Sequence, residues 1–148
     1  MAKRARLIGI NHVAVEVGDV GQALALYGRL FEFEMRGRLA HMAFVDMGDQ
    51  FIAISEPRSQ PADDARHFGL VVDDVPAARA AVTREGLAMV GHSRRSFDFL
   101  DPWGNRFQVV GYGDVQFDRV EGVKRKLGIE QLGKTDEARR QISERGID

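Results

Sequence analysis

The sequence contains an internal repeat, and this repeat restricts the possible fold more than any other feature. "NHVAVEVGDVGQA" (residues 11–23) aligns with "RHFGLVVDDVPAA" (residues 66–78), and the offset of 55 residues places His67 on His12. The same offset, continued without a gap, pairs like residues further along: Phe44 with Phe99, Asp46 with Asp101, Ile52 with Phe107 and Ile54 with Val109. Because chance rarely keeps one offset over about 100 residues, the chain is predicted to contain two copies of one structural unit.

The first copy is predicted to fold as β-α-β-β-β. Val13, Val15 and Val17 alternate with more polar residues, as in a strand with one buried face. Asp19 is suited to cap a following helix. The apolar side of that helix has residues at helical spacing: Val20, Ala23, Leu24, Tyr27, Leu30 and Phe31. Three shorter strands are expected near residues 34–38, 42–46 and 50–55.

The second copy repeats this plan. Asp74 caps the helix, Pro76 stands in its first turn and Gly86 suits its end. Further strands are expected near residues 88–92, 96–100 and 105–112. The predicted fold class is α+β, with two tandem modules (about 7–57 and 62–113) that form one domain over residues 1–113 and a curved mixed sheet around a cavity.

The tail, residues 114–148, lies outside the repeat and is predicted to be helical. One apolar stripe ends at Gly128: Phe117, Val120, Val123 and Leu127. Thr135 is suited to cap a second helix that ends at Gly146. We expect the tail to pack on the body or on a second subunit, and we expect a homodimer.

Composition excludes several classes of function. The formal net charge is −1, so no overall field attracts nucleic acid or an anionic membrane, and neither is expected as a partner. The absence of cysteine excludes disulfides and thiol catalysis. The apolar run before Asn11 is too short for a signal peptide, which predicts a cytoplasmic protein. The chain has no Walker loop, dinucleotide-binding glycine motif or nucleophile elbow.

Strand alternation predicts that three polar side chains point away from the helices. His12 and His67 each alternate with the helix-facing residues of their strands, so they point to the opposite face. Gln108 lies between the helix-facing Phe107 and Val109 and points away from the helix in the same way. An amide in such a run costs free energy unless it is hydrogen-bonded, so it is either a core residue with a partner or part of a site. If the sheets curve together, His12, His67 and Gln108 line one concave surface.

Three motifs resemble the vicinal oxygen chelate superfamily, whose members include glyoxalase I, extradiol dioxygenases, methylmalonyl-CoA epimerase and the fosfomycin- and bleomycin-resistance proteins. "NHVAVEVGDV" is similar to the first strand of that family, "HFGLVVDDV" to the matching strand of its second module, and "DPWGNRFQV" to its final turn and strand. The resemblance covers about residues 7–112. It implies the fold, but it is a poor guide to the reaction, because one scaffold hosts several chemistries.

The resemblance also implies a metal site. The ligand positions of the family fall on His12, Ala53, His67 and Gln108, and members with three protein ligands usually have His, His and Glu. Two imidazoles suit a divalent Fe, Mn, Ni, Co or Zn ion. Gln108 departs from the pattern: it either coordinates through its amide oxygen, donates a hydrogen bond to a ligand, or is a structural amide.

The remaining site candidates are weaker. The expected substrate pocket consists of the residues around those ligand positions: Phe51, Ala53, Gly69, Arg106 and Gln108. Arg106 is either a contact for an anionic substrate or a solvated rim residue. Glu16 shares a face with His12 and either supplies a carboxylate there or, more simply, is a surface charge at a strand end. His41 is expected on the surface, and the basic cluster of His92, Arg94 and Arg95 in a solvated loop. Aromatic residues either shape the pocket or, more simply, belong to the core: Phe97, Phe99 and Trp103.

Three functions are compatible with these features. The first is a metal-dependent lyase, isomerase or dioxygenase acting on a small oxygenated molecule, with His12 and His67 as ligands. The second is a metal-free module that binds or sequesters a small molecule, similar to bleomycin-resistance proteins. The third is a role in assembly alone, which the polar residues on one face disfavour. The sequence assigns no residue as the catalytic acid or base.

Overall fold

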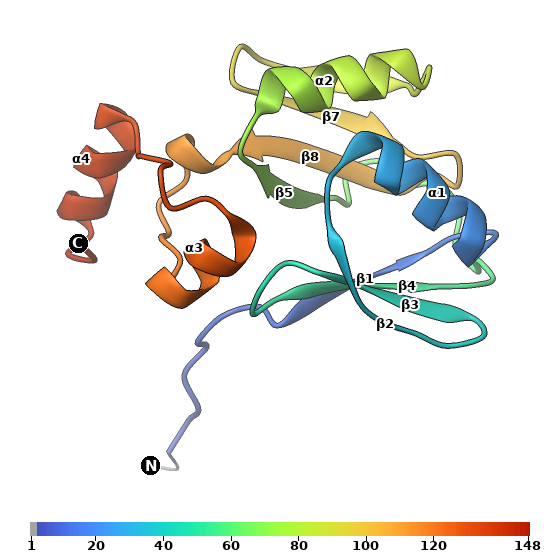
Figure 1. Cartoon of the computed structure of the whole chain (residues 1–148), viewed down its shortest axis with the longest axis horizontal. Helices are drawn as coiled ribbons and strands as arrows, with labels where there is room; N and C mark the ends of the chain where they lie inside the picture. The colour runs from blue at the N-terminus through green and yellow to red at the C-terminus, as the bar shows by residue number, and fades with distance from the viewer. Residues whose placement is uncertain (1–2) are drawn as a thin grey trace.

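The computed structural model describes residues 3–148 and contains two four-stranded sheets, four α-helices and a short 3-10 helix within them (Figure 1). The first module comprises β1 (His12–Glu16), α1 (Val20–Leu30), β2 (Glu34–Arg38), β3 (Met42–Asp46) and β4 (Phe51–Ser55). The second comprises β5 (Phe68–Val72), α2 (Val75–Arg84), β6 (Met89–His92), β7 (Ser96–Leu100) and β8 (Arg106–Gly111). The tail contains η1 (Tyr112–Asp114), α3 (Glu121–Leu127) and α4 (Asp136–Glu144). The predicted tandem β-α-β-β-β fold with a helical tail is confirmed.

The two sheets have the same topology. Their strand orders are β1-β4-β3-β2 and β5-β8-β7-β6, with a parallel pair at the start and antiparallel pairs after it. In Figure 1, α1 lies above the first sheet and α2 above the second. Both sheets therefore turn their helix-free faces toward the lower side of the molecule in this view, the side on which strand alternation places the candidate site.

The helix boundaries follow from local chemistry. The Asp19 carboxylate accepts a hydrogen bond from the Gln22 backbone N–H, and the Asp74 carboxylate accepts one from Ala77. Each bond satisfies an N–H group that lacks a partner in the first turn. After α2, Gly86 has a positive φ of 69°, a conformation that glycine adopts without steric cost.

The two modules share one hydrophobic core. The fully buried rings of Phe97 and Phe99 lie on the inner face of the second sheet, where Phe99 stacks on Phe107 at 5.1 Å between centroids. Tyr27 of α1 contacts the same Phe107 ring edge-on at 5.8 Å. The helix of the first module therefore packs against the sheet of the second, and Phe97 and Phe99 belong to the core, as the simpler interpretation of the sequence held.

The predicted repeat correspondence is wrong in the middle of each module. Phe44 pairs with Ala53 across β3 and β4, and Asp98 pairs with Gln108 across β7 and β8. The structural equivalent of Phe44 is thus Asp98, and not Phe99, which faces the core. The reason is a turn of different length: four residues (47–50) join β3 to β4, whereas five (101–105) join β7 to β8. The offset of 55 holds for β1, for the start of the helix and for β4, and it becomes 54 for β2 and β3.

The tail folds back onto the body. α3 begins at Glu121, so Phe117 and Val120 precede the helix and the predicted stripe was too long. Gly128 and Gly146 both have positive φ, and Thr135 caps α4, as expected. Val123 lies against the β3–β4 turn: a Cβ added to Gly48 would come within 2.8 Å of its side chain. Within residues 3–148, no helix has both the length and the apolar character to cross a bilayer.

Candidate functional site

His12 stands on the helix-free face of the first sheet. Its exposed ring stacks on Phe51 of β4, with centroids 4.7 Å apart and planes 14° from parallel. β1 and β4 pair in register, so His12 lies directly opposite Phe51. The His12 Nδ1–H donates to the Asn11 Oδ1 at 2.8 Å. This bond places the proton of the neutral ring on Nδ1 and the lone pair on Nε2.

His67 occupies the equivalent position just before β5 in the second module. Its ring is exposed, and its Nδ1–H donates to the Ala65 carbonyl oxygen at 2.8 Å. A carbonyl oxygen only accepts, so the proton of the neutral ring is on Nδ1 and the lone pair is on Nε2. The two histidines therefore have the same tautomer, although their Nδ1 partners come from different chemical groups. An oxygen partner on one ring nitrogen is the usual arrangement of a metal-binding histidine.

Gln108 lies in the middle of the helix-free face of the second sheet. It pairs with Gly69 of β5 on one side and with Asp98 of β7 on the other. Phe107 and Val109 are buried on the opposite face, whereas Gln108 is half-buried. The predicted alternation is confirmed, and the amide belongs to a partly solvated surface and not to the core.

Asp98 and Arg106 form an ion pair beside Gln108. The Arg106 Nε and Nη2 each lie 2.8 Å from the Asp98 Oδ2, and the carboxylate side chain is only 9% exposed. The Arg106 Nη1 donates to the Asp64 carbonyl oxygen at 2.7 Å. All three guanidinium nitrogens thus have a protein partner, so Arg106 holds its own sheet together whether or not it also faces a ligand.

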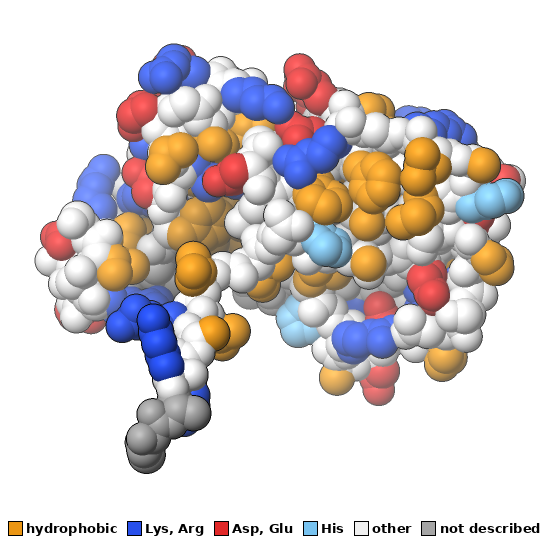
Figure 2. Space-filling view, turned by 90° about the horizontal axis from the view of Figure 1, so that it is seen from below, with side chains coloured by type: hydrophobic (Ala, Val, Ile, Leu, Met, Phe, Trp, Pro, Cys, Tyr) orange, Lys and Arg blue, Asp and Glu red, His pale blue; other side chains and the backbone are white. Residues whose placement is uncertain are grey.

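The structure sorts the predicted site residues into two groups. His12, Phe51 and Ala53 belong to the first sheet; Gly69, Arg106 and Gln108 belong to the second, next to His67. Figure 2 views the helix-free side and shows histidine side chains near its middle, beside a hydrophobic patch. Among the described residues, no cluster of three or more His, Asp or Glu side chains within one chain is arranged to hold a metal ion.

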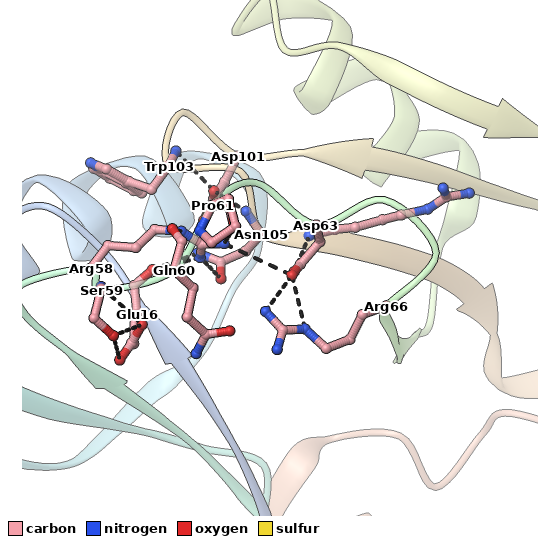
Figure 3. Close-up of polar contacts among 11 residues, drawn as sticks. Glu16, Arg58, Ser59, Gln60, Pro61, Asp63, Arg66, Asp101, Trp103 and Asn105 are labelled. Carbon is pink, nitrogen blue, oxygen red and sulfur yellow. Dashed lines mark hydrogen bonds and ion pairs between the residues drawn. The ribbon is translucent and has the colours of Figure 1, made fainter.

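The linker between the modules is fixed by a polar network (Figure 3). The side chain of Arg58 donates to the carbonyl oxygens of Glu16 (3.2 Å) and Pro61 (2.6 Å) and to the Asn105 Oδ1 (2.6 Å). Glu16 accepts hydrogen bonds from the backbone N–H and the hydroxyl of Ser59, and these bonds lower its pKa. Glu16 thus anchors the linker, a role that its place at a strand end did not indicate.

The "DPWGN" turn joins this network to the core. The Asp101 carboxylate accepts hydrogen bonds from the Tyr27 hydroxyl (2.6 Å), from the Asn105 amide (2.8 Å) and from the Trp103 and Asn105 backbone N–H groups. Gly104 has a φ of 89°, and a Cβ there would lie 2.6 Å from Ala62. The most conspicuous motif in the sequence is therefore structural: it ties α1, the linker and β8 together.

The other sequence candidates lie apart from these two faces. His41 is exposed, as predicted, and its Nδ1 bonds to Glu56, whose pKa this contact lowers. Arg94 and Arg95 line an open groove of about 790 Å³ beside α2, where Arg95 lies 3.6 Å from Asp114. The groove is lined by both aspartate and arginine side chains, which gives it no single charge.

Three contributors to the site were not predicted from the sequence. Asp98 pairs with Gln108 on the neighbouring strand. Its polar side chain between two phenylalanines was a signal in the sequence, but the ungapped repeat alignment paired Phe99, and not Asp98, with Phe44. Asn11 directly precedes His12 and could have been found as its neighbour. Arg36, whose guanidinium carbon lies 4.6 Å from the Phe51 ring centroid, had no signal, because a bulge in β2 directs it there.

Known proteins share parts of this sequence and fold. A model of the glyoxalase/bleomycin resistance protein/dioxygenase superfamily matches residues 9–109, more than half of the chain. The chain belongs to this superfamily. The resemblance drawn from the motifs of the sequence, to the vicinal oxygen chelate proteins, is thereby confirmed.

Individual relatives are distant. The metallothiol transferase FosB of Bacillus licheniformis is 25% identical over 128 residues, which cover 78% of this chain and 82% of that protein. The fosfomycin resistance protein FosX of Listeria monocytogenes, solved with Mn(II) and sulfate, superimposes with a TM-score of 0.62 at 17% identity, covering 82% of this chain and 99% of that one. A lactoylglutathione lyase from Agrobacterium tumefaciens gives 0.55 at 22% identity, with coverages of 70% and 93%. The two structural matches show the shared fold.

Proposed function

We propose that this glyoxalase-superfamily protein is a divalent-metal-dependent lyase, isomerase or dioxygenase acting on a small oxygenated molecule. His12 and His67 would bind the metal through Nε2, and Gln108 would supply its amide oxygen as a weaker third ligand. The observation that carries the proposal is the matched anchoring of the two rings: each Nδ1–H donates to an oxygen, which leaves both Nε2 atoms available. Two ligands of one metal at repeat-related positions would both have to offer the same ring nitrogen, as these two rings do.

The donor set fits a divalent Fe, Mn, Ni, Co or Zn ion, because two imidazoles and an amide oxygen suit these ions. The relatives support this choice, since one is named a metallothiol transferase and another was solved with Mn(II). When bound, such an ion would hold neighbouring substrate oxygens and stabilise negative charge that develops on them. Phe51 and Ala53 would provide the apolar wall beside His12, and the Asp98–Arg106 pair would keep the strand that presents Gln108 in place.

The division of the ligands between two sheets supports a homodimer. His12 belongs to one sheet, whereas His67 and Gln108 belong to the other. In a pair of chains, the helix-free faces of two copies would enclose the substrate and exclude water from it. A small-molecule ligand held between these faces fits the apolar patch on that side of the molecule (Figure 2).

A second candidate function is metal-free binding or sequestration of a small molecule in the same place. The neutral Gln108 favours it, because the site lacks the carboxylate that would balance the charge of a divalent ion. Under this alternative the two histidines and Gln108 act only as hydrogen-bonding groups.

Metal titration separates the two functions. Protein purified without a metal-affinity tag is titrated calorimetrically with Mn²⁺, Fe²⁺, Co²⁺, Ni²⁺ and Zn²⁺. We expect the native protein to bind metal. His12→Ala or His67→Ala should lower the metal affinity at least tenfold, because each substitution removes one ligand. His41→Ala is the matched control, since His41 is also exposed and bonded at Nδ1 but lies in the β2–β3 hairpin. Equal affinities in all four proteins, or no binding at all, would leave the metal-free function standing.

A further inference from the structure

A row of side chains crosses the helix-free face of the first sheet and includes His12. The ring of Phe51 stacks on His12 at 4.7 Å, and the guanidinium carbon of Arg36 lies 4.6 Å from the centroid of the same Phe51 ring. His12, Phe51 and Arg36 come from β1, β4 and β2, which lie in that order across the sheet, with β3 before β2. The Phe44 ring packs edge-on against Phe51 at 5.9 Å. The position of the His12 ring thus depends on Phe51, which is itself held by two other side chains.

Arg36 is fixed at the far end of this row. Its Nε donates to the Asp46 Oδ1 at 2.9 Å, and its Nη2 donates to the carbonyl oxygens of Gly48 and Gln50, both in the β3–β4 turn. The Asp46 side chain is only 6% exposed. Burial alone would raise the pKa of Asp46, but hydrogen bonds from Lys126 and Arg36 lower it, so the carboxylate stays charged. The orientation of Arg36 therefore depends on Asp46 and on the turn that follows it.

The C-terminal tail contacts both Asp46 and the β3–β4 turn. The Lys126 Nζ of α3 lies 3.0 Å from the Asp46 Oδ2, the oxygen that Arg36 does not use. Arg119 donates to the Met47 carbonyl oxygen at 2.9 Å and pairs with Asp49. Val123 packs against Gly48. The tail lies outside the superfamily model, whose match ends at residue 109.

We propose that the C-terminal tail positions His12 through a relay from Lys126 to Asp46, Arg36 and Phe51. The inference rests on the proposed function in one respect. If His12 is a metal ligand, the purpose of the relay is to hold this ligand in one orientation. Arg36 and Lys126 are positioning residues, because neither reaches His12 directly. An exposed imidazole with a single hydrogen bond rotates readily unless its ring face is also held, and Phe51 holds that face.

The first test uses the metal-free protein and the ring nitrogens of its histidines. At about pH 8.5, well above the ordinary histidine pKa of about 6.5, the Nδ1 and Nε2 chemical shifts report which nitrogen carries the proton. We expect His12 of the native chain to show one tautomer, and Arg36→Met to move its two shifts toward each other. The shifts of His67, in the other sheet, are the internal reference and stay unchanged.

Lys126→Met disrupts the relay more mildly than Arg36→Met, because it removes only the contact from the tail. Arg125→Met is its matched control on the same helix. The Arg125 side chain makes no ion pair among the described residues, so its removal leaves the relay intact. Should Arg36→Met fail to fold, which its His67 signals would reveal, Lys126→Met decides alone. Native-like His12 shifts in a folded Arg36→Met or, failing that, in Lys126→Met would overturn the proposal.

The second test measures Co²⁺ binding in the same variants. We expect about tenfold weaker binding by Arg36→Met, as for other groups that orient a metal ligand. Lys126→Met should weaken binding by only about threefold, because Lys126 is half-exposed and Asp46 keeps its bond to Arg36, and Arg125→Met should leave binding unchanged. If the native chain binds no Co²⁺, the proposed function fails, while the nitrogen shifts still decide whether the relay exists. If it binds Co²⁺ and all variants bind it equally, the relay fails and the proposed function stands.

Discussion

At the scale of single residues, Gln108 determines how strongly this site can hold a metal. Two neutral imidazoles and a neutral amide leave the charge of a divalent ion without compensation. The nearest carboxylate on the same face, Asp98, is already paired with Arg106. The site is therefore expected to bind divalent ions more weakly than a site with a carboxylate ligand, and this difference is measurable.

Gln108→Glu should strengthen metal binding. The two side chains have nearly the same shape, so β8 should tolerate the exchange, and a carboxylate adds a full negative charge at the ligand position. We expect the affinity for divalent ions to rise tenfold or more, which corresponds to about 1.4 kcal/mol of binding free energy for each factor of ten. Thermal stability should rise with it when metal is present. Calorimetric titration of both proteins measures it. Gln22→Glu, at an exposed position of α1, adds the same charge away from the helix-free faces. A Gln108→Glu protein that gains no more than this control contradicts the metal site.

Single residues also show what the sequence could predict of the site. Alternation was sufficient to place His12, His67 and Gln108 on helix-free faces, because a strand has only two sides. The Nδ1 partner of His67 could not be predicted, since a backbone carbonyl carries no sequence signal and its position depends on the path of the linker. The environment of His12 was missed for a similar reason, because Arg36 reaches Phe51 only through a bulge in β2.

At the scale of elements, the linker between the modules behaves as a fixed part of the fold. Asp63 accepts two hydrogen bonds from Arg66, at 2.9 and 2.6 Å, and one from the Arg106 backbone N–H at 3.2 Å. Its backbone N–H donates to the Gly104 carbonyl oxygen in the "DPWGN" turn. The repeat predicted a boundary here, but it could not predict the bonds of Asp63 to Arg106 and Gly104, since these join residues far apart in the sequence.

Asp63→Asn should destabilise the protein in a pH-dependent way. Burial opposes the ionised form of Asp63, but the hydrogen bonds from Arg66 and Arg106 outweigh it and lower the pKa. The ionised carboxylate therefore stabilises the fold above its unfolded pKa of about 3.9, and this stabilisation is lost as pH falls through the lower folded pKa. We expect Asp63→Asn to cost about 1.5 kcal/mol at neutral pH and less in acid.

Urea unfolding between about pH 7 and pH 3 measures this effect, since the transition midpoint reports stability at each pH. Asp64→Asn is the matched control: Asp64 is exposed, and only its carbonyl oxygen, which the substitution keeps, bonds to Arg106. A difference between native and Asp63→Asn proteins that stays constant as the pH falls would show that the carboxylate charge contributes nothing.

At the scale of the whole molecule, the repeat predicted the architecture and missed how the parts join. Two β-α-β-β-β modules follow from one offset, because each strand and helix keeps its own hydrophobic period. The contact of Tyr27 with Phe107 joins the modules into one core, and no periodicity within a module indicates it. The tail was expected to pack on the body or on a second subunit, and Val123 packs within the chain, against the β3–β4 turn.

The most exposed large apolar side chains of the described residues lie at the other end of the chain. Leu7, Ile8 and Ile10 are 104%, 98% and 72% exposed, and the N-terminal segment extends away from the body (Figure 1). It continues into β1, a strand at the edge of its sheet, which has one side without a neighbouring strand. Burying three such side chains contributes about 1.5–3 kcal/mol each. A second copy of the chain, with a helix-free face of its own, supplies a surface for them.

We therefore predict a homodimer that depends on this N-terminal segment. Sedimentation velocity should show the native chain as a dimer and the Leu7→Asp, Ile8→Asp double variant as a monomer, because carboxylates at these positions oppose burial without removing any contact of the body. Leu39→Asp is the control, since Leu39 is 61% exposed but lies beside the β2–β3 hairpin. If the metal site is shared between copies, the double variant should also lose Co²⁺ affinity, whereas Leu39→Asp should keep it. A native chain that sediments as a monomer at the highest attainable concentration contradicts the homodimer and requires His12, His67 and Gln108 to act within one chain.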